Sequence, residues 1–549
     1  MNQVLADLLF PSITTTIEDC EKKYPERNLK EGAIVTRFAP SPTGFVHMGS
    51  LFSAFVAQKF AQQTEGVFYL RIEDTDQKRS VENGIEGIIR DLKSFHIEIL
   101  EGRIHETEEL GEYGPYLQSE RKDIYHTFAK YLVANGLAYP CFLTEEEIEA
   151  TRKRQEMSKE RIGIYGPYAK YRNLSCDEAI SKIQNGETYI LRLKSPGDFN
   201  KKVILNDVIR GKIEFPENDL DLVILKQDGL PTYHFAHFVD DYLMRTTHVI
   251  RGDEWLSSAP IHLQLFQMFG KKAPKYAHIA PIMKIDDGGK RKLSKRKDPE
   301  AAVSYYFEKG IPTEAVELYL MTIANSNFEE WMQQHPNEDY HNFNLEFKKM
   351  SVSGALFDLE KLENISRNYI SLLSAVEVYD RALEHALVFD LEFAELLKKY
   401  KEKSIQFFNI EREQKKPRKD YVSFGSLKDQ TWYLYDELFE GHEYHLGTIQ
   451  DKNVIQEMME HYINQFFEEQ DDESTWFDKM KAFGESYGYC SNMKEYKANP
   501  EAYSGSIVDI STLIRVIATT LDQTPNLYQI VQLLGKEGLK KRLEIFLNQ

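Results

Sequence analysis

The chain has little cysteine and no long apolar run. Only four of its 549 residues are cysteines and none forms a CxxC pair, which excludes a disulfide scaffold. No uninterrupted apolar stretch approaches the ~18 residues that a membrane span needs. The first residues lack the basic stretch and apolar core that mark a secretory signal. These absences predict a soluble, cytoplasmic protein with no membrane association.

Basic residues are also too few for a surface that coats nucleic acid. The chain carries 68 Lys and Arg against 87 Asp and Glu, a formal net charge of −19, which argues against a general DNA-binding surface. The net charge does not exclude a nucleic-acid partner that the protein contacts through local basic patches. Two such patches stand out, residues 289–297 and 412–419, whereas residues 468–473 form an acidic run. The usual meaning of a charge run is a solvated face of the protein.

The distribution of apolar residues predicts a parallel α/β sheet early in the chain. Residues 33–38 have the pattern of a strand, and residues 50–63 place Leu51, Phe55 and other apolar side chains on one helical face. Residues 67–72 form a continuous apolar run, as expected for a strand buried on both faces. A strand, a helix and a second strand in this order predict a βαβ unit.

Later segments predict that this sheet is interrupted and then followed by helices. Residues 113–216 mix helix and strand signals, and the parallel-sheet pattern is expected to resume at residue 220 with a strand at 222–225. Beyond about residue 305 only helical patterns are found. We therefore expect a sheet split by an insertion of about 100 residues and followed by a long helical tail.

The first turn between a strand and a helix is a candidate for binding phosphate. GxxxxGK[ST] and GxGxxG loops are absent from the sequence, and residues 39–50 (APSPTGFVHMGS) occupy this turn instead. A helix N-terminus offers free N–H groups and a positive dipole end to an anion. Gly49 would let a nucleotide approach the backbone, and His47 could donate to a phosphate oxygen. Taken alone, the pattern is more often an ordinary turn with a surface histidine.

Two further segments could contact a charged ligand. Residues 71–76 (RIEDTD) follow the next strand, at the edge where parallel sheets bind ligands, and their carboxylates could hold an ammonium group or form a solvated acidic turn. Residues 292–296 (KLSKR) follow Gly288 and Gly289. Their lysines would compensate the charge of a departing polyphosphate. Alternatively, these residues form a solvated basic loop.

Together and in this order, the three segments resemble the signatures of class I aminoacyl-tRNA synthetases and, within that class, of bacterial-type glutamyl-tRNA synthetases. Residues 47–50 (HMGS) stand where the family has its HIGH tetrapeptide, and residues 292–296 (KLSKR) stand for KMSKS. The glutamyl subgroup is marked by residues 37–44 (RFAPSPTG) and by RIEDTD, where glutaminyl relatives usually have an RFDDTN-like motif. Further matches lie at residues 114–121, 228–234, 239–244, 249–255 and 357–362.

The resemblance implies an α/β fold with a Rossmann-like parallel-sheet catalytic domain and an all-α C-terminal region. The implied regions are an N-terminal extension (1–32), the two halves of the catalytic domain (33–112 and 220–304), an inserted domain that binds the tRNA acceptor end (113–219), a helical domain that contacts the tRNA stem (305–375) and a helical anticodon-binding region (376–549).

The activity implied by the resemblance is the ligation of L-glutamate to the 3′ end of glutamate tRNA, with ATP and Mg²⁺, through a glutamyl-adenylate. Glutamine tRNA stays open as a second substrate, and a monomer is expected. The implied catalytic residues are His47, Lys292 and Lys295; the ATP contacts are His47, Gly49, Arg79, Glu254, Lys292, Ser294 and Lys295; the glutamate contacts are Arg37, Ala39, Ser41, Glu73, Tyr233 and Arg251; and the tRNA contacts are Asp76, Trp255, Lys415, Lys416, Arg418 and Lys419.

The charges of these side chains fit glutamate as the substrate. A buried Glu73 suits the ammonium group, and the guanidinium forks of Arg37 and Arg251 match the geometry of carboxylates. Tyr233 and Ser41 would add neutral hydrogen bonds. Two arginines facing one side chain favour glutamate over neutral glutamine.

Other functions explain the sequence less well. A synthetase-like protein that only binds tRNA would be expected to have lost His47 or Lys295, yet both are present. Nucleotidylyltransferases with a similar turn are usually much shorter and lack a helical tail, and the same tail argues against a short tRNA-modifying relative. No metal site is expected, because Cys141 has no second cysteine nearby where some synthetases hold zinc, and Tyr171 and Arg172 stand where another ligand would be expected.

Overall fold

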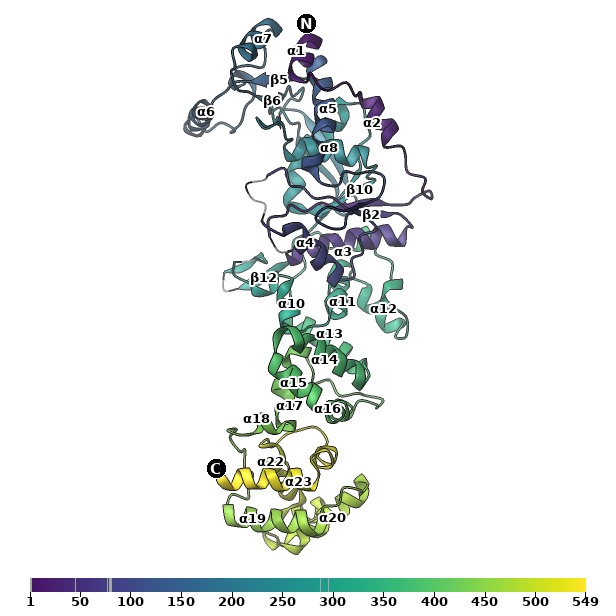
Figure 1. Ribbon diagram of the computed structural model, residues 1–549, viewed down its shortest axis with the longest axis vertical. Coiled ribbons are helices and arrows are strands. Elements are labelled where there is room, and N and C mark those ends of the chain that lie inside the picture. The colour runs from purple at the N-terminus through teal and green to yellow at the C-terminus, as the bar shows by residue number, and fades with distance from the viewer. Residues whose placement is uncertain (1, 45, 77, 79–80, 287, 295) are drawn as a thin grey trace. The chain divides into compact units, whose positions relative to one another are not determined.

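The computed structural model describes the chain except for residues 1, 45, 77, 79–80, 287 and 295. It divides into two compact units, Met1–Tyr305 with Glu317–Asp358, and Tyr306–Val316 with Leu359–Gln549. Strands and helices alternate in the first unit, whereas the second is almost entirely helical (Figure 1). None of the helices in the described part of the chain is long and apolar enough to span a bilayer.

Parallel strands form the centre of the first unit. They are β1 (Val35–Phe38), β2 (Val67–Leu70), β3 (Glu101–Arg103), β10 (His248–Gly252) and β11 (Lys275–Ile279), with β4 (Glu109–Leu110) antiparallel to β3 at one edge. β1 pairs in parallel with β2, and α3 (Met48–Gln63) connects the two strands in the sequence, which confirms the expected βαβ unit. The β10–β11 pair lies beside β1, where the N–H of Thr247 donates to Val35 O at 2.9 Å.

The helix α3 buries the apolar face that the sequence predicts. Its expected face consists of Leu51, Phe52, Phe55, Val56 and Phe60, all of which are buried. The helix begins after His47, whose Nδ1 accepts the N–H of Gly49 at 3.0 Å. A side-chain acceptor at this position satisfies one of the donors that a helix start leaves unpaired.

The strand expected at residues 222–225 forms, but in a different sheet. β9 (Val223–Leu225) pairs antiparallel with β6 (Ile190–Leu193), which pairs antiparallel with β5 (Ala138–Cys141). β7 (Lys202–Asp207) and β8 (Gly211–Pro216) form a separate hairpin. The prediction that the parallel sheet resumes at residue 220 is therefore wrong, and the return comes at β10. A short apolar run reports burial and not strand direction, so the sequence alone does not distinguish the two sheets.

The first 32 residues, expected as an extension, contribute two helices to the core of this unit. α1 (Asn2–Leu9) lies beside α5 (Lys122–Ala134) (Figure 1), and α2 (Ile17–Lys23) begins with a capping box between Thr16 and Asp19. Their buried side chains, which pack in one cluster with Phe128, Leu132 and Phe238, are Leu5, Ala6, Phe10, Ile13, Ile17, Cys20 and Tyr24. This segment is therefore integral to the fold.

The chain up to residue 334 contains further helices and one more hairpin. They are α4 (Gly84–Ser94), α6 (Glu145–Met157), α7 (Cys176–Gln184), α8 (Tyr233–Leu243), α9 (Ala259–Met268), the hairpin of β12 (Met283–Asp286) and β13 (Gly289–Lys292), α10 (Ser304–Lys309), α11 (Thr313–Ala324) and α12 (Phe328–Gln334). Of these elements, α8 and α9 pack on each other and carry the buried polar residues that lie beside the cavity described below.

The helical tail is confirmed from residue 359 to the end of the chain. Its helices are α13 (Leu359–Leu372), α14 (Ala375–Phe389), α15 (Leu391–Lys399), α16 (Lys401–Phe408), α17 (Leu427–Thr431), α18 (Asp436–Phe439), α19 (Lys452–His461), α20 (Glu473–Ser486), α21 (Met493–Ala498), α22 (Ile507–Thr519) and α23 (Leu527–Asn548). One short parallel pair, β14 (Tyr489–Cys490) with β15 (Gly505–Ser506), interrupts the helices. An apolar cluster of buried residues from Ile370 to Phe546, which includes Trp476, Phe483 and Ile510, forms the core of these helices.

Candidate functional site

A cavity of about 820 Å³ lies at the carboxyl ends of the parallel strands. This is the edge at which open α/β sheets bind ligands. The expected site residues that line it are Arg37, Ala39, Ser41, His47, Gly49, Glu73, Asp76, Tyr233, Arg251, Glu254, Trp255 and Lys292. Ser294 is described but does not line the cavity, and the expected Lys295 and Arg79 lie outside the described residues. Segments that are far apart in sequence are thus brought into one place.

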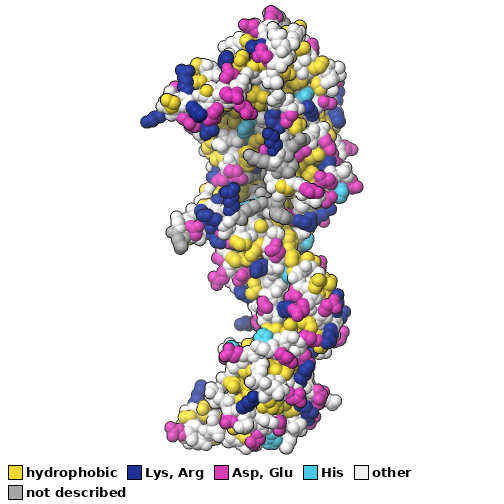
Figure 2. All heavy atoms as spheres, turned by 60° about the vertical axis from the view of Figure 1, so that its left-hand side comes forward, with side chains coloured by type: hydrophobic (Ala, Val, Ile, Leu, Met, Phe, Trp, Pro, Cys, Tyr) yellow, Lys and Arg dark blue, Asp and Glu magenta, His cyan; other side chains and the backbone are white. Residues whose placement is uncertain are grey.

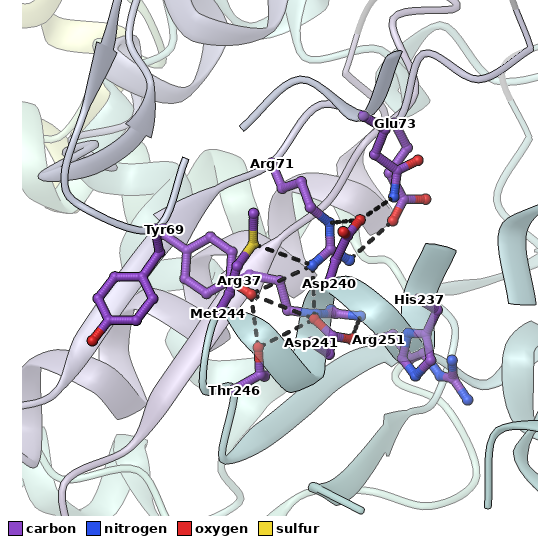
Figure 3. A network of polar contacts seen from close by, with 12 residues as sticks. Arg37, Tyr69, Arg71, Glu73, His237, Asp240, Asp241, Met244, Thr246 and Arg251 are labelled. Atoms are coloured by element: carbon purple, nitrogen blue, oxygen red, sulfur yellow. Dashed lines mark hydrogen bonds and ion pairs between the residues drawn. The ribbon is translucent and has the colours of Figure 1, made fainter. Parts of the chain in front are cut away.

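Behind the cavity, the carboxylate of Asp241 on α8 holds two arginines (Figure 3). Its Oδ1 accepts Arg71 Nη1 at 2.8 Å and Arg37 Nε at 3.2 Å, and its Oδ2 lies 2.9 Å from Nδ1 of His237. All four side chains are buried. Burial by itself would raise the pKa of Asp241, but Arg37 and Arg71 hold it well below its usual value. Asp241 is therefore an ionised anchor for the two guanidinium groups.

The neighbouring Asp240 anchors a third arginine. Its Oδ1 accepts Arg121 Nε at 2.6 Å, and its Oδ2 accepts the hydroxyl of Tyr125 at 2.8 Å and the amide of Gln118 at 2.9 Å. Arg71 Nε lies 3.7 Å from the same Oδ2. Two adjacent carboxylates on α8 are thus surrounded by guanidinium groups and neutral donors, as buried charges require.

Glu73 presents a carboxylate directly to the cavity. Its Oε1 accepts Arg71 Nη2 at 3.2 Å, and its side chain is 11% exposed. Burial raises the pKa of Glu73, although Arg71 and Arg37 act in the opposite direction. A ligand cation beside Glu73 would stabilise the ionised carboxylate that burial disfavours.

Arg251 is buried at the cavity wall, and its hydrogen-bond partners are neutral. Its Nε donates to His278 Nε2 at 3.0 Å, its Nη1 to the Tyr233 hydroxyl at 3.2 Å, and its Nη2 to Trp255 O at 3.2 Å. A second contact of Nη1 is with His262 Nδ1 at 3.2 Å. Within the described part of the chain, no carboxylate forms an ion pair with Arg251. Its charge is therefore available to an anionic ligand in the cavity.

The histidines around Arg251 orient its guanidinium group. His278 Nε2 accepts from Arg251, so the proton of the neutral ring lies on Nδ1, which is 2.7 Å from Asp207 Oδ2. Burial lowers the pKa of His278 and, to well below the usual value, that of His262. Neutral rings can accept hydrogen bonds from the arginine, whereas protonated rings cannot.

The N-terminus of α3 and the β12–β13 hairpin supply the candidate phosphate contacts. Because His47 Nδ1 accepts the N–H of Gly49, a neutral His47 ring carries its proton on Nε2. Lys292, at the end of β13, has Nζ 3.2 Å from Glu254 Oε2. The N–H of Ser294 donates to Asp298 Oδ2 at 2.9 Å, and Arg291 binds both oxygens of the same carboxylate. The segment expected as a basic loop thus begins as a strand with its base fixed by Asp298.

The second expected basic patch divides into internal and surface residues. Arg412 is buried and donates to the backbone oxygens of Phe408, Ile370 and Leu373. Arg418 is 12% exposed, lies 2.9 Å from Asp420 and donates to the Tyr421 hydroxyl. The basic side chains of the patch that are exposed are Lys415, Lys416 and Lys419. On the face that Figure 2 shows, Lys and Arg side chains are scattered among Asp and Glu side chains.

The motif at residues 239–244 contributes to the family resemblance, but the sequence predicted no role for Asp240 or Asp241. It also predicted none for the histidines beside Asp241 and Arg251, which are His237, His262 and His278. A signal was present, because two adjacent acidic residues lie in the helix Tyr233–Leu243, whose other residues are apolar or aromatic apart from two histidines. Asp is almost never fully buried unless it is paired, so such acids predict buried cations elsewhere in the chain. Which arginines pair with them depends on contacts over about 120 to 200 residues, and local patterns do not carry that information.

Comparisons with known proteins agree on one family. The family model described as "tRNA synthetases class I (E and Q), catalytic domain" matches residues 33–364. The chain is 50% identical over 547 residues to a glutamate–tRNA ligase of Clostridium beijerinckii, covering 99% of both chains, and 44% identical to one of Acetivibrio thermocellus, covering 98% of both. A crystal structure of a glutamate tRNA ligase from Elizabethkingia meningosepticum, in complex with its amino acid, superposes with a TM-score of 0.76 at 25% identity. That match covers 94% of this chain and 99% of the other.

Two histidines of α8, the half-buried His234 and the buried His237, make the stability of the fold sensitive to acid. Burial lowers the pKa of His234 to about 4 and that of His237 to about 3, whereas both titrate near the ordinary value of 6.5 in the unfolded chain. Below pH 6.5 the unfolded state therefore binds more protons, and the free energy of unfolding falls as the pH falls. Each histidine that is protonated in the unfolded state and neutral in the folded state lowers the free energy of unfolding by about 1.4 kcal/mol for each pH unit of acidification.

We expect His234→Gln to reduce the slope of unfolding free energy against pH by about 1.4 kcal/mol per pH unit between pH 6 and pH 5, as measured by urea titration. Above pH 8 this histidine is almost fully deprotonated in both states, so the two slopes should coincide there. Identical slopes between pH 6 and pH 5 would show that His234 is not held neutral in the folded protein.

Proposed function

The chain belongs to the class I tRNA synthetases of the glutamate and glutamine type, and we therefore propose that it joins L-glutamate to the 3′ end of glutamate tRNA. In the first step a carboxylate of glutamate attacks the α-phosphorus of ATP, giving glutamyl-adenylate and pyrophosphate. In the second step a hydroxyl of the terminal ribose attacks the adenylate carbonyl and releases AMP. ATP enters as its Mg²⁺ complex, so the metal is part of the substrate.

The observation that carries this proposal is the unpaired charge of Arg251 in the same cavity as Glu73. A guanidinium with neutral partners suits a substrate carboxylate, and Glu73 suits the ammonium group. Arg37 lines the cavity as well and is already oriented by Asp241. The pocket thus matches an amino acid with a second carboxylate better than its neutral amide.

Adenylate formation needs two anions to be brought together, so positioning and charge compensation are the main contributions expected from the protein. His47 and the positive dipole end at the start of α3 suit the α-phosphate region, and Gly49 leaves room for the nucleotide. Lys292 suits the β- and γ-phosphates, with Lys295 and Ser294 from the same segment. Glu254 and Arg79 complete the proposed ATP contacts.

The proposed tRNA contacts are divided among the regions of the chain that the sequence defines. We assign the acceptor end to the insertion (113–219), the stem to residues 305–375 and the anticodon arm to residues 376–549. Asp76 and Trp255 line the cavity, where the tRNA 3′ end would have to enter. The insertion also has a second cavity of about 450 Å³, in which Arg161 Cζ lies 3.6 Å from the ring centre of Phe199. Aromatic and guanidinium planes of this kind stack on unpaired bases.

The direct test is charging of purified glutamate and glutamine tRNAs with either amino acid. We expect glutamate to be attached to glutamate tRNA, and Arg251→Gln to lower kcat/KM for glutamate by roughly 10- to 100-fold, the loss of one or two charged hydrogen bonds. Glutamine should lose much less, because it has no second carboxylate.

Arg152→Gln serves as the control, since Arg152 is exposed on α6 and forms a surface ion pair with Glu156 one helical turn away. It should leave both amino acids unaffected. Equal losses for glutamate and glutamine in Arg251→Gln would mean that Arg251 does not read the side-chain carboxylate.

For the patch in the second unit, we expect replacement of Lys415, Lys416 and Lys419 with Ser to raise KM for tRNA. The slope of log K against log salt should flatten by about one unit for each phosphate that the variant no longer neutralises. Binding titrations over a salt series measure this slope.

Arg412→Met is the matched control, because Arg412 belongs to the same patch but is buried. It should lower the thermal stability of the second unit and leave the salt slope unchanged. If the triple lysine variant kept the wild-type slope, the surface lysines would not contact tRNA.

A further inference from the structure

Residues 21–27 of the N-terminal segment attach to the end of α8. Glu21 Oε1 accepts both the Tyr242 hydroxyl and Lys271 Nζ at 2.5 Å. Just beyond the helix, Arg245 Nη2 donates to Tyr24 O at 2.6 Å, and Arg27 Nε donates to Met244 O at 3.1 Å. The last turn of α8, which follows directly on Asp240 and Asp241, is therefore held by a segment from the beginning of the chain.

A buried ion pair connects the same segment to residues 71–73. Arg27 donates to both oxygens of Glu101 at 2.7 and 2.6 Å, and the two side chains are 8% and 12% exposed. Glu101 also accepts the hydroxyl of Tyr116 at 2.9 Å, and the backbone oxygen of Tyr116 accepts the N–H of Ile72 at 2.8 Å. Ile72 lies between Arg71 and Glu73, so this route ends at the carboxylate that faces the cavity.

Tyr24 provides a third connection. Its side chain is completely buried, and its hydroxyl donates to Gly114 O at 2.7 Å. Arg121 Cζ lies 5.7 Å from the centre of its ring, and Arg121 is the partner of Asp240. These three sets of contacts meet at α8 and at residues 71–73. Asp241 on α8 binds Arg37 and Arg71, and Arg71 binds Glu73, as Figure 3 shows.

We propose that Tyr24 and Arg27 are positioning residues for the amino-acid pocket, and that residues 21–27 brace α8 against residues 71–73. This inference rests on the proposed function for the identity of the ligand. A charged pocket discriminates only when its groups are held within about half an ångström of the productive geometry. Tyr24 and Arg27 do not line the cavity and act through Asp240, Arg71 and Glu73.

Two variants release the brace in different ways. Arg27→Met combined with Glu101→Gln removes the ion pair without leaving an unpaired buried charge. Tyr24→Phe removes only the hydrogen bond to Gly114. The control is Lys130→Met, because Lys130 Nζ donates to Ile13 O at 2.8 Å and thus ties the N-terminal segment to α5 through a residue that lies outside 21–27.

The experiment measures KM for glutamate, ATP and tRNA in the charging reaction, at a temperature well below the melting point of each variant. We expect the double variant to raise KM for glutamate by ~10-fold or more and Tyr24→Phe to raise it several-fold. KM for ATP should stay within about twofold of the wild type, since the brace does not reach α3 or the β12–β13 hairpin. Lys130→Met should lower the melting temperature and leave KM for glutamate unchanged.

Two results would overturn the brace: an unchanged KM for glutamate in both variants, or a parallel rise of all three KM values. If the double variant does not fold, Tyr24→Phe decides the question alone. Failure of the proposed function looks different, because the wild type itself would then not charge tRNA with glutamate. In that case calorimetric titration of wild type and Tyr24→Phe with glutamate tests the brace, and equal affinities would overturn it.

Discussion

The arrangement of the site depends on the burial of two adjacent carboxylates, Asp240 and Asp241, in the apolar helix α8. A buried carboxylate without partners is strongly unfavourable, so each must be neutralised in place. Arg37, Arg71 and Arg121 do this from three separate segments of the chain. The same ion pairs that make the burial tolerable fix where β1, β2 and the start of α5 stand relative to α8. Packing requirements and the geometry of the pocket are therefore met by one set of contacts.

Arg251 contrasts with these three arginines. Its partners are a tyrosine hydroxyl, a backbone oxygen and two histidines whose pKa burial lowers. Arg37, Arg71 and Arg121 are thus paired with buried carboxylates, whereas no carboxylate among the described residues forms an ion pair with Arg251. Glu73 complements it with a carboxylate in the same cavity. A substrate with two carboxylates and one ammonium group would satisfy both groups, which is why charge distribution, more than shape, supports the proposed amino acid.

Much of the pocket could be predicted from the sequence because its residues lie in short motifs at strand ends. The turn before α3, residues 71–76 and the segment after β10 all meet at one edge of the sheet, as the βαβ pattern implies. The antiparallel position of β9 was not predictable, since an apolar run does not encode its partner. The burial of Arg412 and of Tyr24 escaped prediction for a similar reason: both residues look polar or isolated in sequence, and each has a partner that is distant in sequence, Leu373 for Arg412 (39 positions away) and Gly114 for Tyr24 (90 positions away).

The measurement that tests this account most directly is calorimetric titration of Asp241→Asn with glutamate and, separately, with ATP. Asparagine has nearly the same shape but removes the charge that orients Arg37 and Arg71. The account predicts that the folded variant binds glutamate at least ~10-fold more weakly, a loss of about 1.4 kcal/mol or more, while its affinity for ATP is unchanged. A folded variant with wild-type affinity for glutamate would contradict the central role of the buried carboxylate.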